Sequence, residues 1–377
     1  MDERIRKKMK TYKHLYEEFI SEENIKLAIR NGTKKKRHRP LFNKIYNNQE
    51  KYVPKFQEIC KRYYNRQHKP KEIYDGITRK KRIILVPAPY EQIVHHMVVN
   101  ILKPIFMKSM YEYSCGSIPK RGGHMAKKHI QKWIYNDIKN TKYCLKMDIR
   151  KYFESIPHDI LKAKLSRIIL DKDFLKVVNT IIDVQEVGLP LGFYTSQWLA
   201  NFYLTDLDHF IKEELCAKYY VRYMDDMVIL GGNKRQLHKM RQEIEKYLNE
   251  ILGLQMKDNW QVFKIEYVDK HGNTHGRALD FMGFKFYRNR TTLRHNIMLR
   301  ASKKARRIKK KDKPTLYDCR QMLSYTGWIS ATDTYGFYKK YIKPYVNIRY
   351  MKKRISKHER RSKYVGNSRI QFQTNRV

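Results

Sequence analysis

The sequence contains little that could crosslink the chain or carry it into a membrane. Its five cysteines are odd in number and widely scattered, so they support neither a disulfide framework nor a zinc site of the usual Cys-x-x-Cys spacing. No apolar run approaches the length of a membrane-spanning helix, and the first residues lack the pattern of a signal peptide. We therefore expect a reduced, soluble, cytoplasmic protein with no membrane partner.

Acidic residues are also scarce. The chain has 37 Asp and Glu against 81 Lys and Arg, a formal net charge of +44, which predicts a polyanionic partner. A basic tail is the simplest alternative, but the basic residues are spread along the chain and interleaved with aromatic rings (13%, including 29 Tyr) that could stack on bases. With 377 residues, 41% of them hydrophobic, the chain can bury a sizeable core and form two or three subdomains.

Two adjacent carboxylates, Asp225 and Asp226, lie between the apolar runs 219–221 and 227–230. Such runs broken by a short acidic tip predict a β-hairpin with both aspartates at or beside the turn. Asp-Asp is also ordinary turn chemistry, and the pair alone does not separate the two interpretations. A third carboxylate favours function, because Asp148 ends another strand-like run upstream.

Nucleotide polymerases need such an acidic trio. Two Mg²⁺ ions about 4 Å apart activate the 3′ hydroxyl and neutralise the departing pyrophosphate. Mg²⁺ prefers hard oxygen ligands, so aspartates from neighbouring strands, waters and the substrate phosphates suffice. We expect Asp148 and Asp225 to bridge the metals and Asp226 to support them, with Ile149 completing the metal site.

Other segments predict further elements. Residues 1–70 are typical of basic helices, with 34–39 as a loop or phosphate-contacting patch, although a solvated basic face is the commoner meaning of such a run. The glycine-bearing basic loop 116–123 lacks the spacing of a P-loop, which excludes nucleotide hydrolysis of that kind. Strands are expected at 83–86 and in a β-rich patch at 281–284, and helices around 93–102, from the loop after Gly188 to about Leu215, over 237–251 and within 294–313.

The order of these motifs resembles a reverse transcriptase, specifically the bacterial branch that holds group II introns, retrons, diversity-generating retroelements and abortive-infection enzymes. The resemblance runs from about Arg79 to Lys340. It implies an α+β fold of the right-hand polymerase type, with fingers, a palm of antiparallel sheet plus helices, and a helical thumb. The implied parts are a basic helical N-terminal extension (1–70), fingers (71–147), a palm with part of the fingers interleaved (148–290), a thumb (291–350) and a basic C-terminal tail (351–377).

The resemblance also implies roles for particular residues. Arg82 matches the position that grips the incoming triphosphate, Phe153 matches the ring that blocks a ribose 2′-hydroxyl, and Tyr223 to Asp226 is the YxDD box. Phe281 to Phe284 resembles the primer-grip turn. The implied substrate-binding residues are Arg82, Phe153, Leu191, Gly192, Ser196 and Gln197, and the implied primer- and template-binding residues are Tyr223, Met224, Phe281, Gly283, Lys309, Lys310 and Lys311.

The loop after Gly188 points to a subfamily. Most relatives carry Pro-Gln-Gly followed by Ser-Pro, whereas this chain has Leu191-Gly192 and Ser196-Gln197, which looks most like the diversity-generating retroelement enzymes. One departure leaves the lysine that protonates pyrophosphate unassigned, because Asn259-Trp260 stands where other branches often have Lys-Thr. Lys257 and Lys264 are the two candidates.

The resemblance implies an RNA-directed DNA polymerase that makes cDNA from an RNA template and dNTPs with two Mg²⁺ ions. A structured noncoding RNA and a small basic accessory protein are the implied further partners. The alternatives are a reverse transcriptase of an antiviral defence system acting with a noncoding RNA, and a non-catalytic RNA-binding scaffold. The intact aspartates and Phe153 argue against a scaffold, which has no reason to keep metal ligands.

Overall fold

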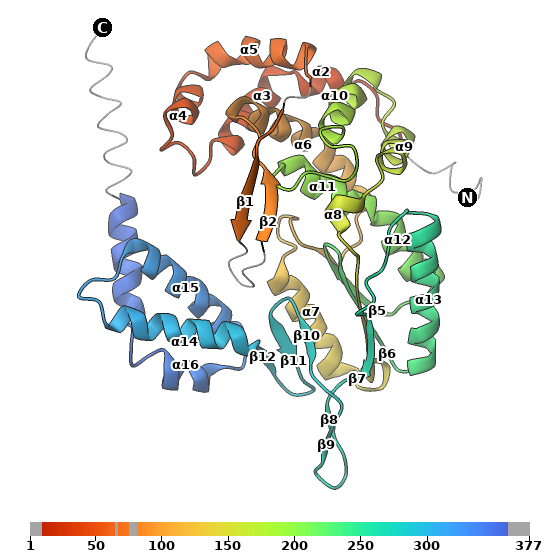
Figure 1. The fold of residues 1–377 in the computed structure, drawn as a ribbon, viewed down its shortest axis with the longest axis vertical. Helices are drawn as coiled ribbons and strands as arrows, with labels where there is room; N and C mark the ends of the chain where they lie inside the picture. The colour runs from red at the N-terminus through yellow and green to blue at the C-terminus, as the bar shows by residue number, and fades with distance from the viewer. Residues whose placement is uncertain (1–9, 65–66, 75–80, 361–377) are drawn as a thin grey trace. The chain divides into compact units, whose positions relative to one another are not determined.

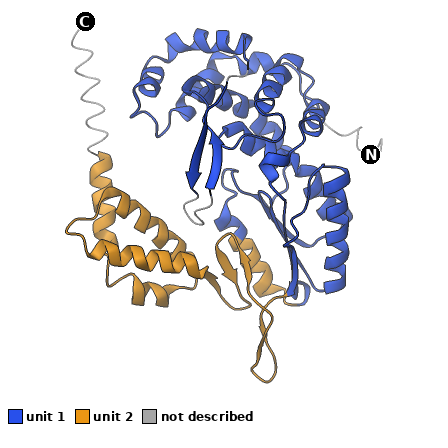
Figure 2. Ribbon diagram, viewed as in Figure 1, with its two compact units in different colours: residues 1–126, 139–263 blue, residues 127–138, 264–377 orange. Residues whose placement is uncertain are grey.

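The computed structural model describes residues 10–64, 67–74 and 81–360, and these form two compact units (Figure 2). Unit 1 comprises residues 1–126 and 139–263, and unit 2 comprises 127–138 and 264–377. Arg79 and Lys80, where the predicted resemblance begins, and residues 361–377 of the predicted basic tail lie outside the described residues. Both units combine helices with β-strands, which confirms the predicted α+β class.

Unit 1 begins with helices between Leu15 and Lys61, as predicted within residues 1–70, of which 1–9 and 65–66 lie outside the described residues. Ser21 caps the second of its helices by accepting a hydrogen bond from the Asn24 amide (3.2 Å), and Pro40 begins the third. Residues 34–39, predicted as a loop or phosphate-contacting patch, form turns and a bend. The helices are α2 (Leu15–Phe19), α3 (Glu22–Gly32), α4 (Pro40–Asn47) and α5 (Gln49–Lys61).

A two-stranded antiparallel hairpin follows, formed by β1 (Pro70–Tyr74) and β2 (Lys81–Leu85), in which Arg82 pairs with Ile73 (Figure 1). The predicted strand at 83–86 is therefore confirmed with a start two residues earlier. The long helix α6 (Pro89–Ser109) contains the predicted helical segment 93–102 and packs against α3. Its buried apolar residues, such as Met97 and Leu102, anchor the core of this half of the unit.

A five-stranded sheet forms the other half of unit 1. Its order is β3-β5-β6-β4-β7, and α13 (Lys234–Glu250) packs against β4 and β6. The neighbours β4, β6 and β5 are antiparallel, while β3 runs parallel to β5. The strands are β3 (Ser114–Cys115), β4 (Tyr143–Asp148), β5 (Tyr219–Tyr223), β6 (Asp226–Gly231) and β7 (Gln261–Lys264).

The segment predicted to be helical after the Gly188 loop to about Leu215 is helical over Tyr194–Tyr203, Thr205–His209 and Phe210–Glu214, with one break at Leu204. The Phe202 carbonyl accepts a hydrogen bond from the Thr205 hydroxyl (2.8 Å), and the Tyr203 carbonyl accepts one from the buried Lys164 ammonium (3.2 Å). Side chains thus occupy carbonyls that a continuous helix would bond through its own amides. The helices of this part of the chain are α7 (Gly123–Asn136), α8 (Tyr152–Ser155), α9 (His158–Ile168), α10 (Lys172–Ile182), α11 (Tyr194–Tyr203) and α12 (Thr205–His209), with a π-helical turn at Phe210–Glu214.

Unit 2 contains a three-stranded antiparallel sheet followed by helices. The predicted β-rich patch at 281–284 is the turn between two of these strands, and the predicted basic helix within 294–313 is α14. None of the helices in the described ranges is both long enough and apolar enough to span a membrane. The elements are β8 (Tyr267–Val268), β9 (Thr274–His275), β10 (Leu279–Phe281), β11 (Phe284–Phe286), β12 (Thr291–Leu293), α14 (His295–Lys309), α15 (Leu316–Ser330) and α16 (Tyr335–Tyr341).

Candidate active site

The three predicted metal-binding aspartates meet at one end of the sheet in unit 1. Asp148 is the last residue of β4 and pairs in register with Asp226, the first residue of β6. Asp226 also pairs with Tyr223 across the hairpin, so Met224 and Asp225 form its two-residue turn. The predicted hairpin and the predicted strand ending in an acid are both confirmed.

The turn places Asp225 in a negatively charged and partly dry environment. Burial, together with the nearby carboxylates of Asp148 and Asp226, raises the pKa of Asp225 to about 7. Crowded carboxylates repel one another when all are charged, so staying charged without a cation costs free energy. Binding a cation between them is correspondingly more favourable.

Asp148 has one oxygen engaged and one free. Its Oδ2 forms an ion pair with the Lys257 ammonium, whereas its buried Oδ1 has no hydrogen-bond partner among the described residues. Lys257 is held there by its backbone, since its amide donates to the Asp148 carbonyl (2.8 Å). Lys264, the other candidate lysine, lies with its ammonium 3.8 Å from the centroid of the Tyr267 ring in unit 2. The structure therefore favours Lys257 as the lysine beside the aspartates.

These groups fit Mg²⁺, although within the described ranges no three His, Cys, Asp or Glu side chains converge closely enough to hold a metal ion by themselves. Mg²⁺ usually takes only one or two carboxylates and keeps waters or substrate phosphates as its other ligands. The unpartnered Oδ1 of Asp148 and the crowded Asp225 are such ligands. Ile149 and Met256 form an isolated antiparallel β-bridge. The backbone hydrogen bonds beside it are accepted by the Asp148 and Gln255 carbonyls, so the Ile149 carbonyl remains available as the predicted metal ligand.

The Gly188 loop fixes the backbone of Phe153. The Leu189 amide donates to the Phe153 carbonyl (2.6 Å), and His158 donates to the Gly188 carbonyl (2.7 Å). A Cβ atom on Gly188 would lie 2.6 Å from the same Phe153 carbonyl oxygen, and Gly188 has a φ of +80°, so only glycine fits here. The Gly188 loop therefore fixes the backbone of the residue whose half-buried ring is predicted to test the sugar.

The same loop connects to the hairpin that carries Arg82. The Leu85 amide of β2 donates to the Leu191 carbonyl (2.8 Å). Gly192 has a φ of +107°, and a Cβ atom there would lie only 2.2 Å from the Leu85 carbonyl oxygen. Leu191 and Gly192, two predicted substrate-binding residues, thus contact Leu85 on β2, the strand that also carries Arg82.

The remaining two predicted substrate-binding residues lie on α11 and differ in what they can reach. Ser196 is buried, and its hydroxyl donates to the Pro190 carbonyl (2.8 Å), which favours a role in shaping the loop over the predicted contact with substrate. Gln197 is half-exposed, and its carbonyl oxygen accepts a hydrogen bond from Ser117 (2.6 Å), a residue of the glycine-bearing basic loop. Gln197 therefore remains a predicted substrate-binding residue.

The predicted primer-grip and thumb residues belong to unit 2. Phe281 is fully buried, and Gly283, with a φ of +85°, lies against Trp328, so both shape the turn. Of the three thumb lysines, Lys311 pairs with the buried Asp318 (2.7 Å), and Lys309 lies over the Tyr345 ring (5.5 Å). Lys310 is exposed.

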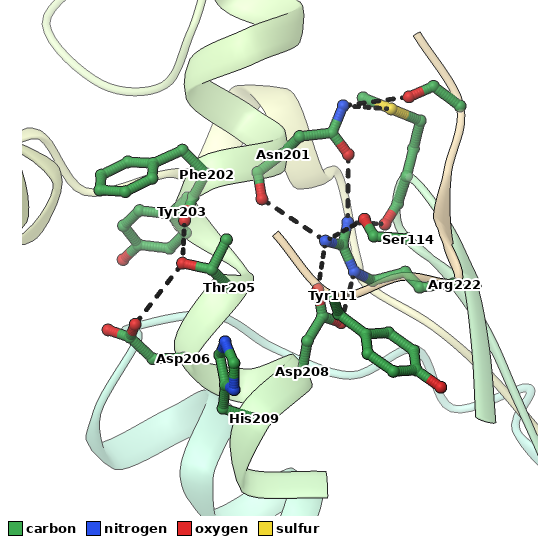
Figure 3. A network of polar contacts seen from close by, with 12 residues as sticks. Tyr111, Ser114, Asn201, Phe202, Tyr203, Thr205, Asp206, Asp208, His209 and Arg222 are labelled. Carbon is green, nitrogen blue, oxygen red and sulfur yellow. Dashed lines mark hydrogen bonds and ion pairs between the residues drawn. The ribbon is translucent and has the colours of Figure 1, made fainter. Parts of the chain in front are cut away.

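A buried polar network that was not predicted from the sequence joins β5 to α11 and α12 (Figure 3). Arg222 and Asp208 are both buried and form an ion pair (2.6 Å). Asn201 and Ser114 complete the network. The sequence did contain a signal for this network, a basic residue inside an otherwise apolar strand. Such a charge is costly to bury without a partner, so a buried partner could have been expected.

Residues 67–286 match the model of the protein family described as reverse transcriptase (RNA-dependent DNA polymerase). The matched range contains β1 and β2, all three aspartates and β10 and β11. It ends before the helices α14 to α16.

Among curated proteins, the chain is similar to intron and retron proteins. It is 29% identical over 150 residues to an uncharacterised 91 kDa protein in the cob intron of Schizosaccharomyces pombe, covering 37% of this chain and 18% of that protein. It is 30% identical over 145 residues to the retron Ec73 reverse transcriptase of Escherichia coli (35% and 45%), and 23% identical over 256 residues to YkfC of Escherichia coli K12 (56% and 65%). The aligned part thus spans less than two thirds of the length of each of these relatives.

Two solved structures of telomerase are more distantly similar. The Candida albicans telomerase in complex with a fragment of telomeric RNA matches with a TM-score of 0.46 and 13% identity, covering 78% of this chain and 58% of that chain. The apo telomerase of Candida tropicalis matches with a TM-score of 0.47 and 13% identity, covering 68% and 52%.

Proposed function

Because more than half of its residues match that family model, the chain belongs to the reverse transcriptase (RNA-dependent DNA polymerase) family, and we propose that it synthesises DNA on an RNA template. The observation that carries this proposal is the register of β4 and β6, which puts Asp148 opposite Asp226 and beside Asp225. The net charge of +44 suits a nucleic-acid substrate.

In the proposed reaction, Asp148 and Asp225 hold two Mg²⁺ ions, with Asp226 and the Ile149 carbonyl in support. When bound, the ions would activate the 3′ hydroxyl of the primer and neutralise charge on the pyrophosphate. Lys257, whose ammonium already lies at Asp148, is placed to donate a proton to the leaving pyrophosphate.

The other residues orient the nucleotide. Arg82 on β2 offers a guanidinium for the triphosphate, which it can bind through a planar fork of donors. Phe153, fixed by Leu189 and Gly188, excludes a ribose 2′-hydroxyl through the bulk of its ring. In this proposal the fingers, palm and thumb follow the predicted boundaries at 71–147, 148–290 and 291–350.

The test is Asp225→Asn, measured with a DNA primer annealed to an RNA template, Mg²⁺ and dNTPs. The substitution removes one ligand charge while keeping the shape of the side chain, so DNA synthesis should fall by at least about a hundredfold, with RNA affinity unchanged. Glu250→Gln, at the end of α13, is the matched control and should retain full synthesis. Synthesis by the Asn variant at the wild-type rate would remove the catalytic assignment.

We place the enzyme in a diversity-generating retroelement, acting in the cytoplasm with a structured noncoding RNA and a small basic accessory protein. Leu191 supports this choice, because its apolar side chain in the Gly188 loop offers no hydrogen bond that would hold a correctly paired nucleotide in register. Errors concentrated opposite template adenine are the expected signature. If the enzyme copies adenine as accurately as the other bases, the antiviral defence context takes precedence, and sequencing the RNA that co-purifies with the protein would identify its template.

A further inference from the structure

Arg222 lies in β5, two residues before the turn that carries Asp225, and its side chain is completely buried. A buried charge is costly unless it is paired and fully hydrogen-bonded. Asp208, on α12, provides the pairing through two parallel bonds, from Nε to Oδ1 (2.8 Å) and from Nη2 to Oδ2 (2.6 Å) (Figure 3). Tyr220 donates a further hydrogen bond to Asp208 (2.7 Å), so the carboxylate is also fixed.

The remaining donors of Arg222 reach the catalytic turn. Its Nη1 donates to the Met224 carbonyl (2.9 Å), which belongs to the peptide unit that joins Met224 to Asp225. Met224 has a φ of 56°, a left-handed conformation that is unfavourable for a residue with a side chain. A bond from the Met224 amide to the Cys115 carbonyl (3.0 Å) and the bond from Arg222 hold this conformation from both sides. The orientation of Asp225 therefore depends on the guanidinium.

The network also reaches α11, the helix that follows the Gly188 loop. Asn201 on α11 accepts a hydrogen bond from Arg222 (3.3 Å) and donates to the Gly116 carbonyl (3.1 Å) and the Met224 sulfur (3.3 Å). Ser114 on β3 accepts another bond from Arg222 (2.7 Å). One guanidinium thus joins β3, α11, α12 and the turn of the β5–β6 hairpin.

We propose that Arg222 is a positioning residue that sets the Met224–Asp225 turn at the angle needed for metal binding, with Asp208 as its fixed counter-ion. This inference rests on the proposed polymerase function. A buried ion pair with only a structural role can often be replaced without loss, and it has no need to bond the carbonyl of a left-handed turn residue. The contact with Met224 is what assigns Arg222 to the site.

The experiment compares Arg222→Lys with wild type. A lysine keeps the charge beside Asp208 but cannot bond Asp208, Met224 and Ser114 at once, because it lacks the planar fork. We expect kcat to fall about 10- to 100-fold, since small misplacements of catalytic groups have effects of that size, with the KM for dNTP changed by less than about twofold. Mn²⁺ titrated in place of Mg²⁺ and followed by electron paramagnetic resonance should bind several-fold more weakly.

The matched control is Arg241→Lys on α13. Arg241 also pairs with a carboxylate, that of Glu245, and lies over the Trp260 ring (4.6 Å), but it makes no contact with the catalytic turn. It should leave kcat and Mn²⁺ affinity at the wild-type values. If Arg222→Lys does not fold, Asn201→Ala replaces it and should show the same loss of kcat and Mn²⁺ affinity.

The outcomes separate the two proposals. Wild-type Mn²⁺ affinity and kcat in a folded Arg222→Lys protein would overturn the positioning role, as would a change confined to KM or one that merely follows the folded fraction. A wild-type protein that makes no DNA would overturn the proposed function, and the Mn²⁺ titration would still decide whether Arg222 sets the geometry of the aspartates.

Discussion

At the scale of single residues, the acidic trio was accessible from the sequence because each aspartate stands at the end of an apolar run. Asp148, Asp225 and Asp226 lie where the alternation of the sequence predicted them. Of the residues around them, Arg222 and Asp208 were not predicted, and Lys257 was one of two candidate lysines. Arg222 pairs with Asp208, and Lys257 with Asp148 over a separation of 109 residues, contacts that only the folded chain creates.

Asp225 gives a prediction on pH and stability. In the unfolded chain its carboxyl has its ordinary pKa of 3.8, whereas burial and the neighbouring Asp148 and Asp226 raise the folded pKa to about 7. The folded protein therefore binds more protons between these values, so this contribution to stability is complete below about pH 4 and is lost as the pH rises to about 7.

The measurement is denaturant unfolding in EDTA at pH 5 and pH 8. Asp225→Asn should be more stable than wild type at pH 8 by on the order of 4 kcal/mol, since each unit of pKa shift corresponds to about 1.4 kcal/mol, and by less than half as much at pH 5, where the Asp225 carboxyl is ionised only in the unfolded chain. Mg²⁺ replaces the proton, so it should stabilise the wild type more at pH 8 than at pH 6. An identical pH dependence in the two proteins would show that Asp225 titrates normally.

At the scale of elements, local patterns predicted what local chemistry determines. The hairpin of β5 and β6 follows from its apolar runs, α13 from apolar periodicity and α14 from its spaced basic residues, and all were predicted within a few residues. The parallel contact of the two-residue strand β3 with β5 has no such pattern, because too few residues take part. The break after α11 depends on Lys164, which comes from another helix.

The loop between α10 and α11 gives the prediction at this scale. Gly192→Ala forces a Cβ atom against the Leu85 carbonyl, so the backbone contact between β2 and Leu191 must open. We expect a loss of about 1–3 kcal/mol in the free energy of unfolding and a several-fold rise in the KM for dNTP, with RNA affinity unchanged.

Gly327→Ala is the control for this substitution. Gly327 lies within α15 with no atom within 4 Å of an added Cβ, so alanine should be neutral or slightly stabilising. Steady-state kinetics and thermal unfolding check both variants. If Gly192→Ala keeps the wild-type KM, the contact between β2 and the loop has no part in nucleotide binding.

At the scale of the whole molecule, the net charge of +44 predicts RNA binding but not its location. Salt dependence measures how many phosphates a protein contacts, with a log–log slope of about −0.7 for each contact on a single strand. From the sequence, Lys309, Lys310 and Lys311 were predicted together, because adjacent lysines in a basic run cannot be told apart until the side chains that they contact are known.

The structure separates these three lysines. Lys311 and Lys304 both form ion pairs with the buried Asp318. Burial alone would raise the pKa of Asp318, but the hydrogen bonds from the two lysines lower it, so Asp318 stays charged and keeps its partners. Lys311 therefore has a counter-ion already and releases little counter-ion from RNA, whereas the exposed Lys310 is available to a phosphate.

We accordingly expect Lys310→Gln to flatten the slope of RNA affinity against salt by about 0.7, the value of one phosphate contact. Lys311→Gln is the matched change one residue away and should alter the slope much less, because it removes a charge that Asp318 has already neutralised. Fluorescence anisotropy with a labelled single-stranded RNA across a range of salt concentrations gives both slopes. Equal flattening by the two variants would mean that Lys311 leaves Asp318 to bind RNA, and no change in either would make this end of α14 a solvated basic surface.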